Sequence, residues 1–151
     1  MNARPEGRLS RDDSGAYQMG SYTLKCIKTN QKFVDDYTLH FSDGALIQAE
    51  YNEKFQPIDE MGVWRYFDWL PTKEISSQIA GTVTYRAVKL GKKLGLSNLW
   101  IAFHGYWPEM NAICPTGSFK DMEAVPTIQR MKDHSCAGMI CASAGNTARA
   151  F

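Results

Sequence analysis

The feature that most constrains this chain is a short segment, residues 114–121, in which a single lysine follows a proline, a glycine and a serine. The proline and glycine predict a sharp turn. Ser118 and Asp121 have the three-residue spacing of a helix N-cap and its reciprocal acidic partner. Lys120 is then the second residue of a helix, where the positive end of the helix dipole favours a neutral amine. A neutral lysine amine can attack a carbonyl and form a Schiff base, although a surface lysine in a first helical turn has the same pattern.

A second segment follows about one helix and one turn later. Residues 137–142 form a short apolar run, which predicts a buried strand. The strand leads into a small polar turn and then a helix, which begins near Ala148. A strand, a glycine turn and a helix N-terminus together present free backbone N–H groups that can bind an anion. The turn consists of Ser143, Ala144, Gly145, Asn146 and Thr147.

In this order, the two segments resemble the pyridoxal-phosphate enzymes of the tryptophan-synthase-β fold type, also called fold type II. The resemblance implies that Lys120 is the Schiff-base lysine that holds pyridoxal 5'-phosphate. It implies that Asn146 lies beside the ring hydroxyl of the cofactor. The substrate carboxylate is then received by the rest of the turn, which is Ser143, Ala144, Gly145 and Thr147.

Upstream segments narrow the resemblance. Residues 81–86 and 90–101 resemble the threonine-synthase branch, with Val83 and Thr84 where a Thr-Pro pair is usual. Four segments resemble the archaeal cysteate-synthase family: residues 69–71, 105–109, 118–120 and 142–147. That family implies a β-replacement in which O-phospho-L-serine and sulfite give L-cysteate and phosphate, a step of coenzyme M biosynthesis. Two alternatives stay open: a threonine synthase-like lyase acting on O-phosphohomoserine, and a non-catalytic fragment or scaffold that retains the motif.

The resemblance also implies a fold class, α/β, and an N-terminal portion of a longer enzyme. We expect a disordered leader at residues 1–20, a ribbon-like β subdomain at 21–52 and the start of the cofactor-binding α/β domain at 53–151. The glycine-rich loop for the cofactor phosphate and the partner of the pyridine nitrogen are expected beyond residue 151. The complete enzyme is expected to be a homo-oligomer that acts on a small amino-acid substrate.

The ribbon-like region has the spacing of a zinc ribbon but few of its ligands. Alternating apolar residues predict strands at 22–26, 36–40 and 45–51. The four ribbon positions are occupied by Cys26, Thr29, His40 and Asp43, of which only the cysteine and the histidine are good zinc ligands. We therefore predict no metal here, and a hairpin held by aromatic packing.

Between the ribbon and the lysine, the aromatic residues of 64–71 predict a linking segment packed on a core. We expect a helix at 85–95, a strand at 98–103 and a helix from 119 to about 134 that is kinked or broken at Pro126. His104 and Glu109, on the loop that leads toward Lys120, are equally consistent with a role at the reacting centre and with none.

The net charge of +1 gives no electrostatic reason to expect nucleic acid or a membrane surface as a partner. No apolar run approaches the ~20 residues of a membrane span, and the first residues lack a signal-peptide core, so we expect a cytoplasmic protein. The four cysteines are expected to be reduced thiols.

Overall fold

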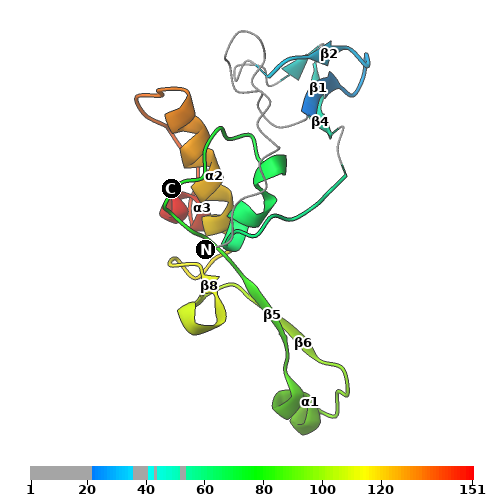
Figure 1. Ribbon diagram of the computed structural model, residues 1–151, viewed down its shortest axis with the longest axis vertical. Coiled ribbons are helices and arrows are strands. Elements are labelled where there is room, and N and C mark those ends of the chain that lie inside the picture. The colour runs from blue at the N-terminus through cyan, green and yellow to red at the C-terminus, as the bar shows by residue number, and fades with distance from the viewer. Residues whose placement is uncertain (1–21, 36–40, 43, 52–53) are drawn as a thin grey trace.

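The computed structural model describes residues 22–35, 41–42, 44–51 and 54–151 (Figure 1). These residues form helices and small antiparallel sheets, a mixture that is compatible with the α/β class. No helix among the described residues is long and apolar enough to cross a membrane.

The N-terminal region is a four-stranded antiparallel sheet with the order β2-β1-β4-β3. The predicted strands at 22–26 and 45–51 are confirmed, and they pair from Tyr22 opposite Tyr51 to Cys26 opposite Ile47. Cys26 is fully buried at the end of this register. The strands are β1 (Tyr22–Cys26), β2 (Lys32–Phe33), β3 (Phe41–Ser42) and β4 (Ala45–Tyr51).

Part of the ribbon-like region cannot be compared with its prediction. The expected strand at 36–40 and two of the four ribbon positions, His40 and Asp43, lie outside the described residues. The absence of a zinc site in this region therefore stays a prediction.

The aromatic linking segment forms a 3-10 helix, η1 (Gly62–Trp69), that packs as predicted. Trp64 is 1% exposed, and its indole N–H donates to the carbonyl of Gln78 at 2.7 Å. The ring of Trp69 stacks on that of Tyr51 in β4, with centroids 4.3 Å apart. The stacking of Trp69 on Tyr51 joins the N-terminal sheet to the rest of the chain.

An arm projects away from this body (Figure 1). It consists of the antiparallel pair β5 (Val83–Arg86) and β6 (Trp100–Phe103) with the short helix α1 (Val88–Leu94) at its tip. The prediction of a helix from residue 85 was wrong at its start, because Tyr85 and Arg86 pair with β6. The helix begins only at Val88. Gly95 ends α1 with the left-handed φ of +71° that favours glycine.

The lysine segment follows a second small hairpin. This hairpin is built from β7 (Tyr106–Trp107), a 3-10 turn η2 (Pro108–Met110) and β8 (Ala112–Ile113). Ile113 also forms a β-bridge with Gly81, which lies just before β5. This bridge fixes the chain immediately upstream of residue 114.

The long helix α2 (Lys120–Asp133) confirms the helix predicted at 119–134. The helix is not broken at Pro126, because α2 continues through this residue, and a kink there stays a prediction. Pro126 is buried, as are Ala124 and Gln129 on the same helix, so packing offsets the one backbone hydrogen bond that a proline removes.

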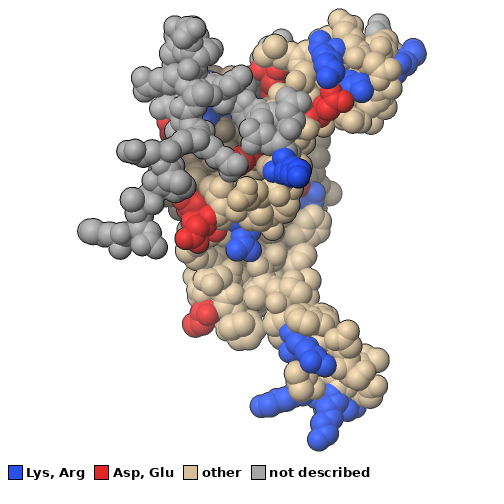
Figure 2. Space-filling model, turned by 45° about the vertical axis from the view of Figure 1, so that its right-hand side comes forward, with Lys and Arg blue, Asp and Glu red and all other residues tan. Residues whose placement is uncertain are grey.

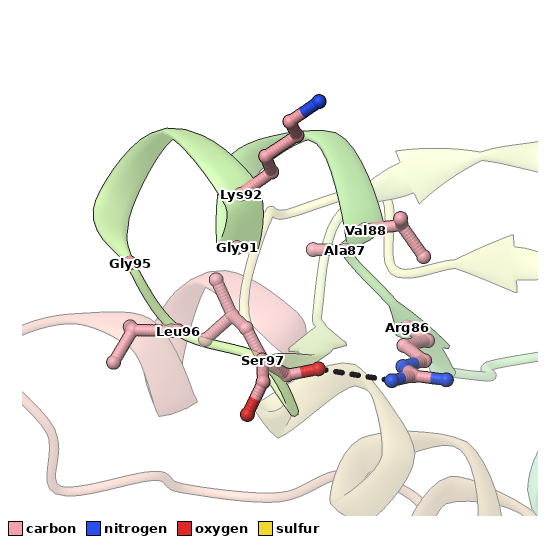
Figure 3. Close-up of a pocket in the computed structure, with 9 residues that line it drawn as sticks. Arg86, Ala87, Val88, Gly91, Lys92, Gly95, Leu96 and Ser97 are labelled. Carbon is pink, nitrogen blue, oxygen red and sulfur yellow. Dashed lines mark hydrogen bonds between the residues drawn. The ribbon is translucent and has the colours of Figure 1, made fainter.

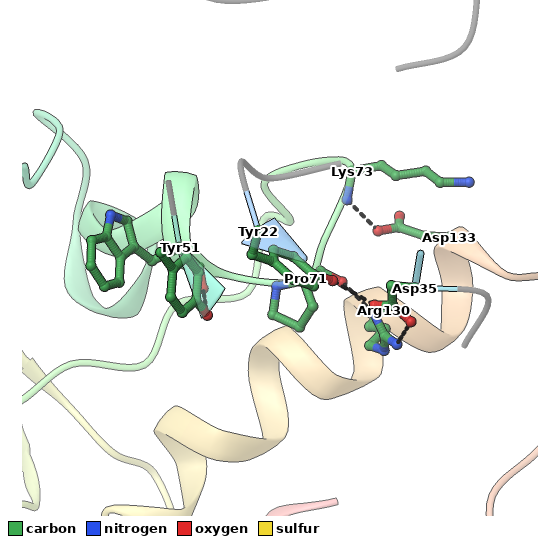
Figure 4. Close-up of polar contacts among 8 residues, drawn as sticks. Tyr22, Asp35, Tyr51, Pro71, Lys73, Arg130 and Asp133 are labelled. Carbon is green, nitrogen blue, oxygen red and sulfur yellow. Dashed lines mark hydrogen bonds and ion pairs between the residues drawn. The ribbon is translucent and has the colours of Figure 1, made fainter. Parts of the chain in front are cut away.

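The N-terminal sheet region is tied to α2 by a partly buried ion pair (Figure 4). The guanidinium of Arg130 donates to both carboxylate oxygens of Asp35, at 2.8 and 2.9 Å, and to the carbonyl of Pro71 at 3.3 Å. The phenol of Tyr22 in β1 donates to the same Asp35 at 2.5 Å. Burial, together with the Asp35 carboxylate, raises the pKa of Tyr22.

Candidate functional site

Lys120 is the first residue of α2, one position earlier in the helix than expected. Its ammonium lies 2.5 Å from the carboxylate of Glu123, one helical turn ahead, and 5.3 Å from the centroid of the Phe119 ring. The Lys120 side chain is 30% exposed. The amine is therefore accessible, and in this structure it is engaged in an i,i+3 ion pair.

The predicted capping box between Ser118 and Asp121 was wrong, because neither side chain makes the bond expected of it. Phe119 occupies the N-cap position without a side-chain cap bond, and the hydroxyl of Ser118 accepts the N–H of Lys120 at 3.2 Å. The carboxylate of Asp121 folds back beyond Ser118 to the N–H and hydroxyl of Thr116, at 3.0 and 2.9 Å. Gly117, with φ of +72°, turns the chain so that Thr116 comes within reach of this carboxylate.

Cys114 anchors the turn at its other end. Its side chain is fully buried, and its thiol donates to the carbonyl of Gly81 at 3.2 Å. Burial, with the nearby Asp121 carboxylate, raises the pKa of the Cys114 thiol. A thiol held in its protonated form is a poor nucleophile, so Cys114 acts as a packing and hydrogen-bonding residue.

The strand predicted at residues 137–142 was wrong. These residues have no regular secondary structure, and Ile140 and Met139 are 100% and 43% exposed. Among the described residues no strand pairs with this segment, and the sheets are formed by residues 22–51 and 81–113.

The polar turn that follows leads into a short helix, α3 (Asn146–Ala150), which packs beside α2 (Figure 1). The backbone N–H of Gly145 donates to the hydroxyl of Ser143 at 3.2 Å. Ser143, Ala144 and Asn146 are exposed, and Thr147 is half-buried. Packing of α3 on α2 brings the turn and the lysine onto neighbouring helices, but no hydrogen bond or ion pair joins the Lys120 side chain to residues 143–147 within the described part of the chain.

Comparison with known proteins identifies relatives of this chain by sequence. Over 135 residues the chain is 48% identical to a protein of Methanocella paludicola named cysteate synthase, a match that covers 88% of this chain and 32% of that protein. It is 45% identical to a cysteate synthase of Methanosarcina mazei, with the same coverage. It is 41% identical over 136 residues to one of Methanocorpusculum labreanum, covering 88% of this chain and 33% of the relative. The chain is a homologue of the cysteate synthases.

The chain spans about a third of the length of the cysteate synthases it matches. No protein-family model matches it. No solved structure matches it. The likeness to cysteate synthases therefore comes from sequence, and fold type II stays an expectation drawn from the resemblance.

The roles of His104 and Glu109 are not decided by the sequence, and the structure places these two loop residues differently. The ring of His104 lies edge-on to that of Phe119, with centroids 6.0 Å apart, so it adjoins the residue that contacts the Lys120 ammonium. Glu109 is exposed in η2. Of the two, His104 is the one that the fold brings to the neighbourhood of the lysine.

An open pocket of about 310 Å³ lies far from this lysine, at the tip of the arm between α1 and the loop that follows it (Figure 3). Arg86 closes one side by donating to the carbonyl of Ser97 at 2.9 Å. Most of the remaining wall consists of small and aliphatic residues, with Lys92 and Ser97 as further polar members and no carboxylate. Exposed lysines gather on the same tip (Figure 2): Lys89, Lys92 and Lys93.

Sequence reasoning did not find the contacts of Glu123 and Thr116. The Glu123 contact has a local signal, because oppositely charged residues three apart on a helix are neighbours. The Thr116 contact has no such signal, since it depends on the left-handed turn at Gly117.

Proposed function

We propose that this chain carries the lysine segment of a pyridoxal-phosphate-dependent enzyme that converts O-phospho-L-serine and sulfite to L-cysteate and phosphate. The observation that supports the proposal is the 48% identity to a cysteate synthase over 88% of the chain. The matched region includes Lys120, because the unmatched residues are too few to reach this position from either end of the chain.

The residues near Lys120 fit a flat carbonyl cofactor. The amine is partly exposed, and the adjoining Phe119 ring is 54% exposed and can offer an apolar surface to a planar ring. Hydroxyl and amide groups that can bind a carboxylate or a ring oxygen are available on the neighbouring turn, at Ser143, Asn146 and Thr147.

In the proposed reaction, pyridoxal phosphate supplies an electrophilic carbonyl and a ring that stores the charge of a carbanion. Lys120 would hold the cofactor through its Nζ once this amine is released from Glu123. The same Nζ would then take the α-proton of the substrate and return it. The C–O bond to phosphate breaks and a C–S bond to sulfite forms. We propose that Asn146 orients the ring oxygen and that the substrate carboxylate is held by Ser143, Ala144, Gly145 and Thr147.

The test is to reconstitute the full-length protein with pyridoxal phosphate, reduce it with borohydride and map the modified peptide. We expect the label on Lys120, and label on Lys92 or Lys132 in its place would refute the assignment. Cysteate formation is then measured with phosphoserine and sulfite. Turnover of O-phosphohomoserine would instead favour the threonine synthase-like reaction, and label without turnover of either substrate would favour a non-catalytic scaffold.

A further inference from the structure

The start of the lysine helix is tied to the preceding turn by one buried side chain. Asp121 is 5% exposed, and one of its carboxylate oxygens accepts the N–H of Thr116 at 3.0 Å. Both carboxylate oxygens also lie 2.9 Å from the Thr116 hydroxyl. A buried carboxylate is costly unless it is hydrogen-bonded, so these bonds hold the two residues together.

The turn at residues 114–117 is itself hydrogen-bonded to the segments beside the strands. The N–H of Cys114 donates to the carbonyl of Gly105 at 2.9 Å, and the thiol of Cys114 donates to the carbonyl of Gly81 at 3.2 Å. The N–H of Gly117 closes the turn by donating to the carbonyl of Cys114 at 2.9 Å. A continuous chain of bonds therefore runs from the base of the arm through Thr116 to Asp121.

Lys120 immediately precedes Asp121 and begins the helix. The first N–H groups of a helix lack partners within the helix, so contacts with the preceding residues decide its direction. The N–H groups of Asp121 and Met122 donate to the carbonyls of Ser118 and Phe119, at 3.2 and 3.0 Å. The nearest such contacts are the bond from the Lys120 N–H to Ser118 and the carboxylate of Asp121 on Thr116. We propose that the Thr116–Asp121 contact is a positioning device that sets the direction in which the Lys120 amine leaves the helix.

This inference rests on the proposed function, because it concerns the delivery of the Lys120 amine to a carbonyl. The competing explanation is that Asp121 only stabilises the helix, as a carboxylate in a first helical turn does. That explanation predicts a loss of stability with no specific change at the amine. The two explanations are therefore separated by a measurement of lysine reactivity per folded molecule.

The variants are Thr116→Val and Asp121→Asn, with Thr116→Ser to restore the hydroxyl. The matched control is Thr127→Val, which removes a hydroxyl within α2 itself, bonded to the carbonyl of Glu123 at 2.8 Å. In the full-length protein, the rate of pyridoxal-phosphate capture is followed by absorbance. The share of borohydride-fixed label on Lys120 is measured by peptide mapping, and the folded fraction by urea unfolding.

We expect Thr116→Val and Asp121→Asn to slow capture at Lys120 about tenfold, the effect of losing one hydrogen bond to a charged group, and to move label to other lysines. Thr116→Ser and Thr127→Val should stay close to the parent. Equal capture rates in Thr116→Val and Thr127→Val would overturn the positioning role, even if Asp121→Asn is too unstable to measure. Undiminished labelling in Lys120→Ala would instead overturn the proposed function.

Discussion

At the scale of single residues, the state of Lys120 depends on Glu123. The ion pair between them is partly exposed, with side-chain exposures of 30% and 47%, and such i,i+3 pairs are worth about 0.2–0.5 kcal/mol. An amine that attacks a carbonyl must first leave this carboxylate. The pair is therefore weak enough to break readily, and it is only a small barrier to release of the amine.

We predict that Glu123→Gln leaves the free energy of unfolding nearly unchanged and raises the rate of pyridoxal-phosphate capture at Lys120 about twofold, the factor that corresponds to about 0.4 kcal/mol. Capture is measured by stopped-flow absorbance and stability by urea unfolding. A slower capture would show that Glu123 assists the lysine instead of competing for it.

Cys114 gives a prediction of pH dependence. Because the pKa of the buried thiol is raised in the folded protein, the unfolded chain loses this proton first. The stabilising contribution is complete below the unfolded pKa of about 8.5 and is lost as the pH rises toward the folded value. We expect the free energy of unfolding of the parent to fall between pH 8 and 10 more steeply than that of Cys114→Ala, by up to about 1.4 kcal/mol per pH unit.

The measurement is urea unfolding across that pH range with a reducing agent present. Other groups titrate in both proteins, so the difference between the two curves isolates Cys114. Parallel curves would show that the thiol has the same pKa in the folded and unfolded chain.

At the scale of elements, the contact between the N-terminal sheet region and α2 depends on Arg130 and Asp35 (Figure 4). Their side chains are 25% and 8% exposed, and the guanidinium bonds both carboxylate oxygens. Removing one partner of a buried pair leaves an uncompensated charge, which costs more than the pair contributes. The arginine also bonds the Pro71 carbonyl, so it joins three segments that are far apart in the sequence.

We predict that Arg130→Ala lowers the free energy of unfolding by about 2–3 kcal/mol, somewhat less than for a fully buried pair because the arginine is partly exposed. Arg130→Lys should recover only part of this loss, since an ammonium cannot bond both oxygens in the same planar geometry. The control is Lys32→Ala, which breaks an exposed ion pair with Glu50 and should change the free energy of unfolding much less. Equal losses in Arg130→Ala and Lys32→Ala would contradict the assignment.

At the scale of the whole molecule, stability is uneven. A two-stranded sheet is marginal on its own, and so is an isolated helix as short as α1, which has seven residues. The arm also exposes large apolar side chains, including Val88 at 65%, Leu94 at 58% and Trp100 at 56%. The body, by contrast, buries Trp64 and one face of α2.

We predict that backbone amides of residues 83–103 exchange with deuterium well before those of α2. Local opening of the arm requires the loss of few buried contacts, whereas opening of α2 exposes the core of the body. Hydrogen exchange followed by mass spectrometry of peptides checks this order. Equal protection of the arm and α2 would show that the arm is stabilised by contacts that its two strands and short helix do not explain.

Local signals in the sequence determined much of this structure. Alternating residues placed β1 and β4 at their observed bounds, and glycine and helical spacing placed α2 and the end of α1, because these patterns depend on near neighbours. The lysine segment was found for the same reason, since the turn and the start of the helix are encoded within eight residues. Its chemical role was suggested by resemblance and stays a proposal.

Tertiary structure decided the rest, because the deciding contacts join residues that no local pattern connects. Pairing with β6 turned residues 85 and 86 into strand, whereas residues 137–142 pair with no strand in the described part of the chain. Asp35 meets Arg130 across 95 positions of sequence, a contact that exists only after the sheet region and α2 have packed. The partner of Asp121 was decided by a left-handed turn at Gly117, which brings Thr116 within hydrogen-bond distance of the carboxylate.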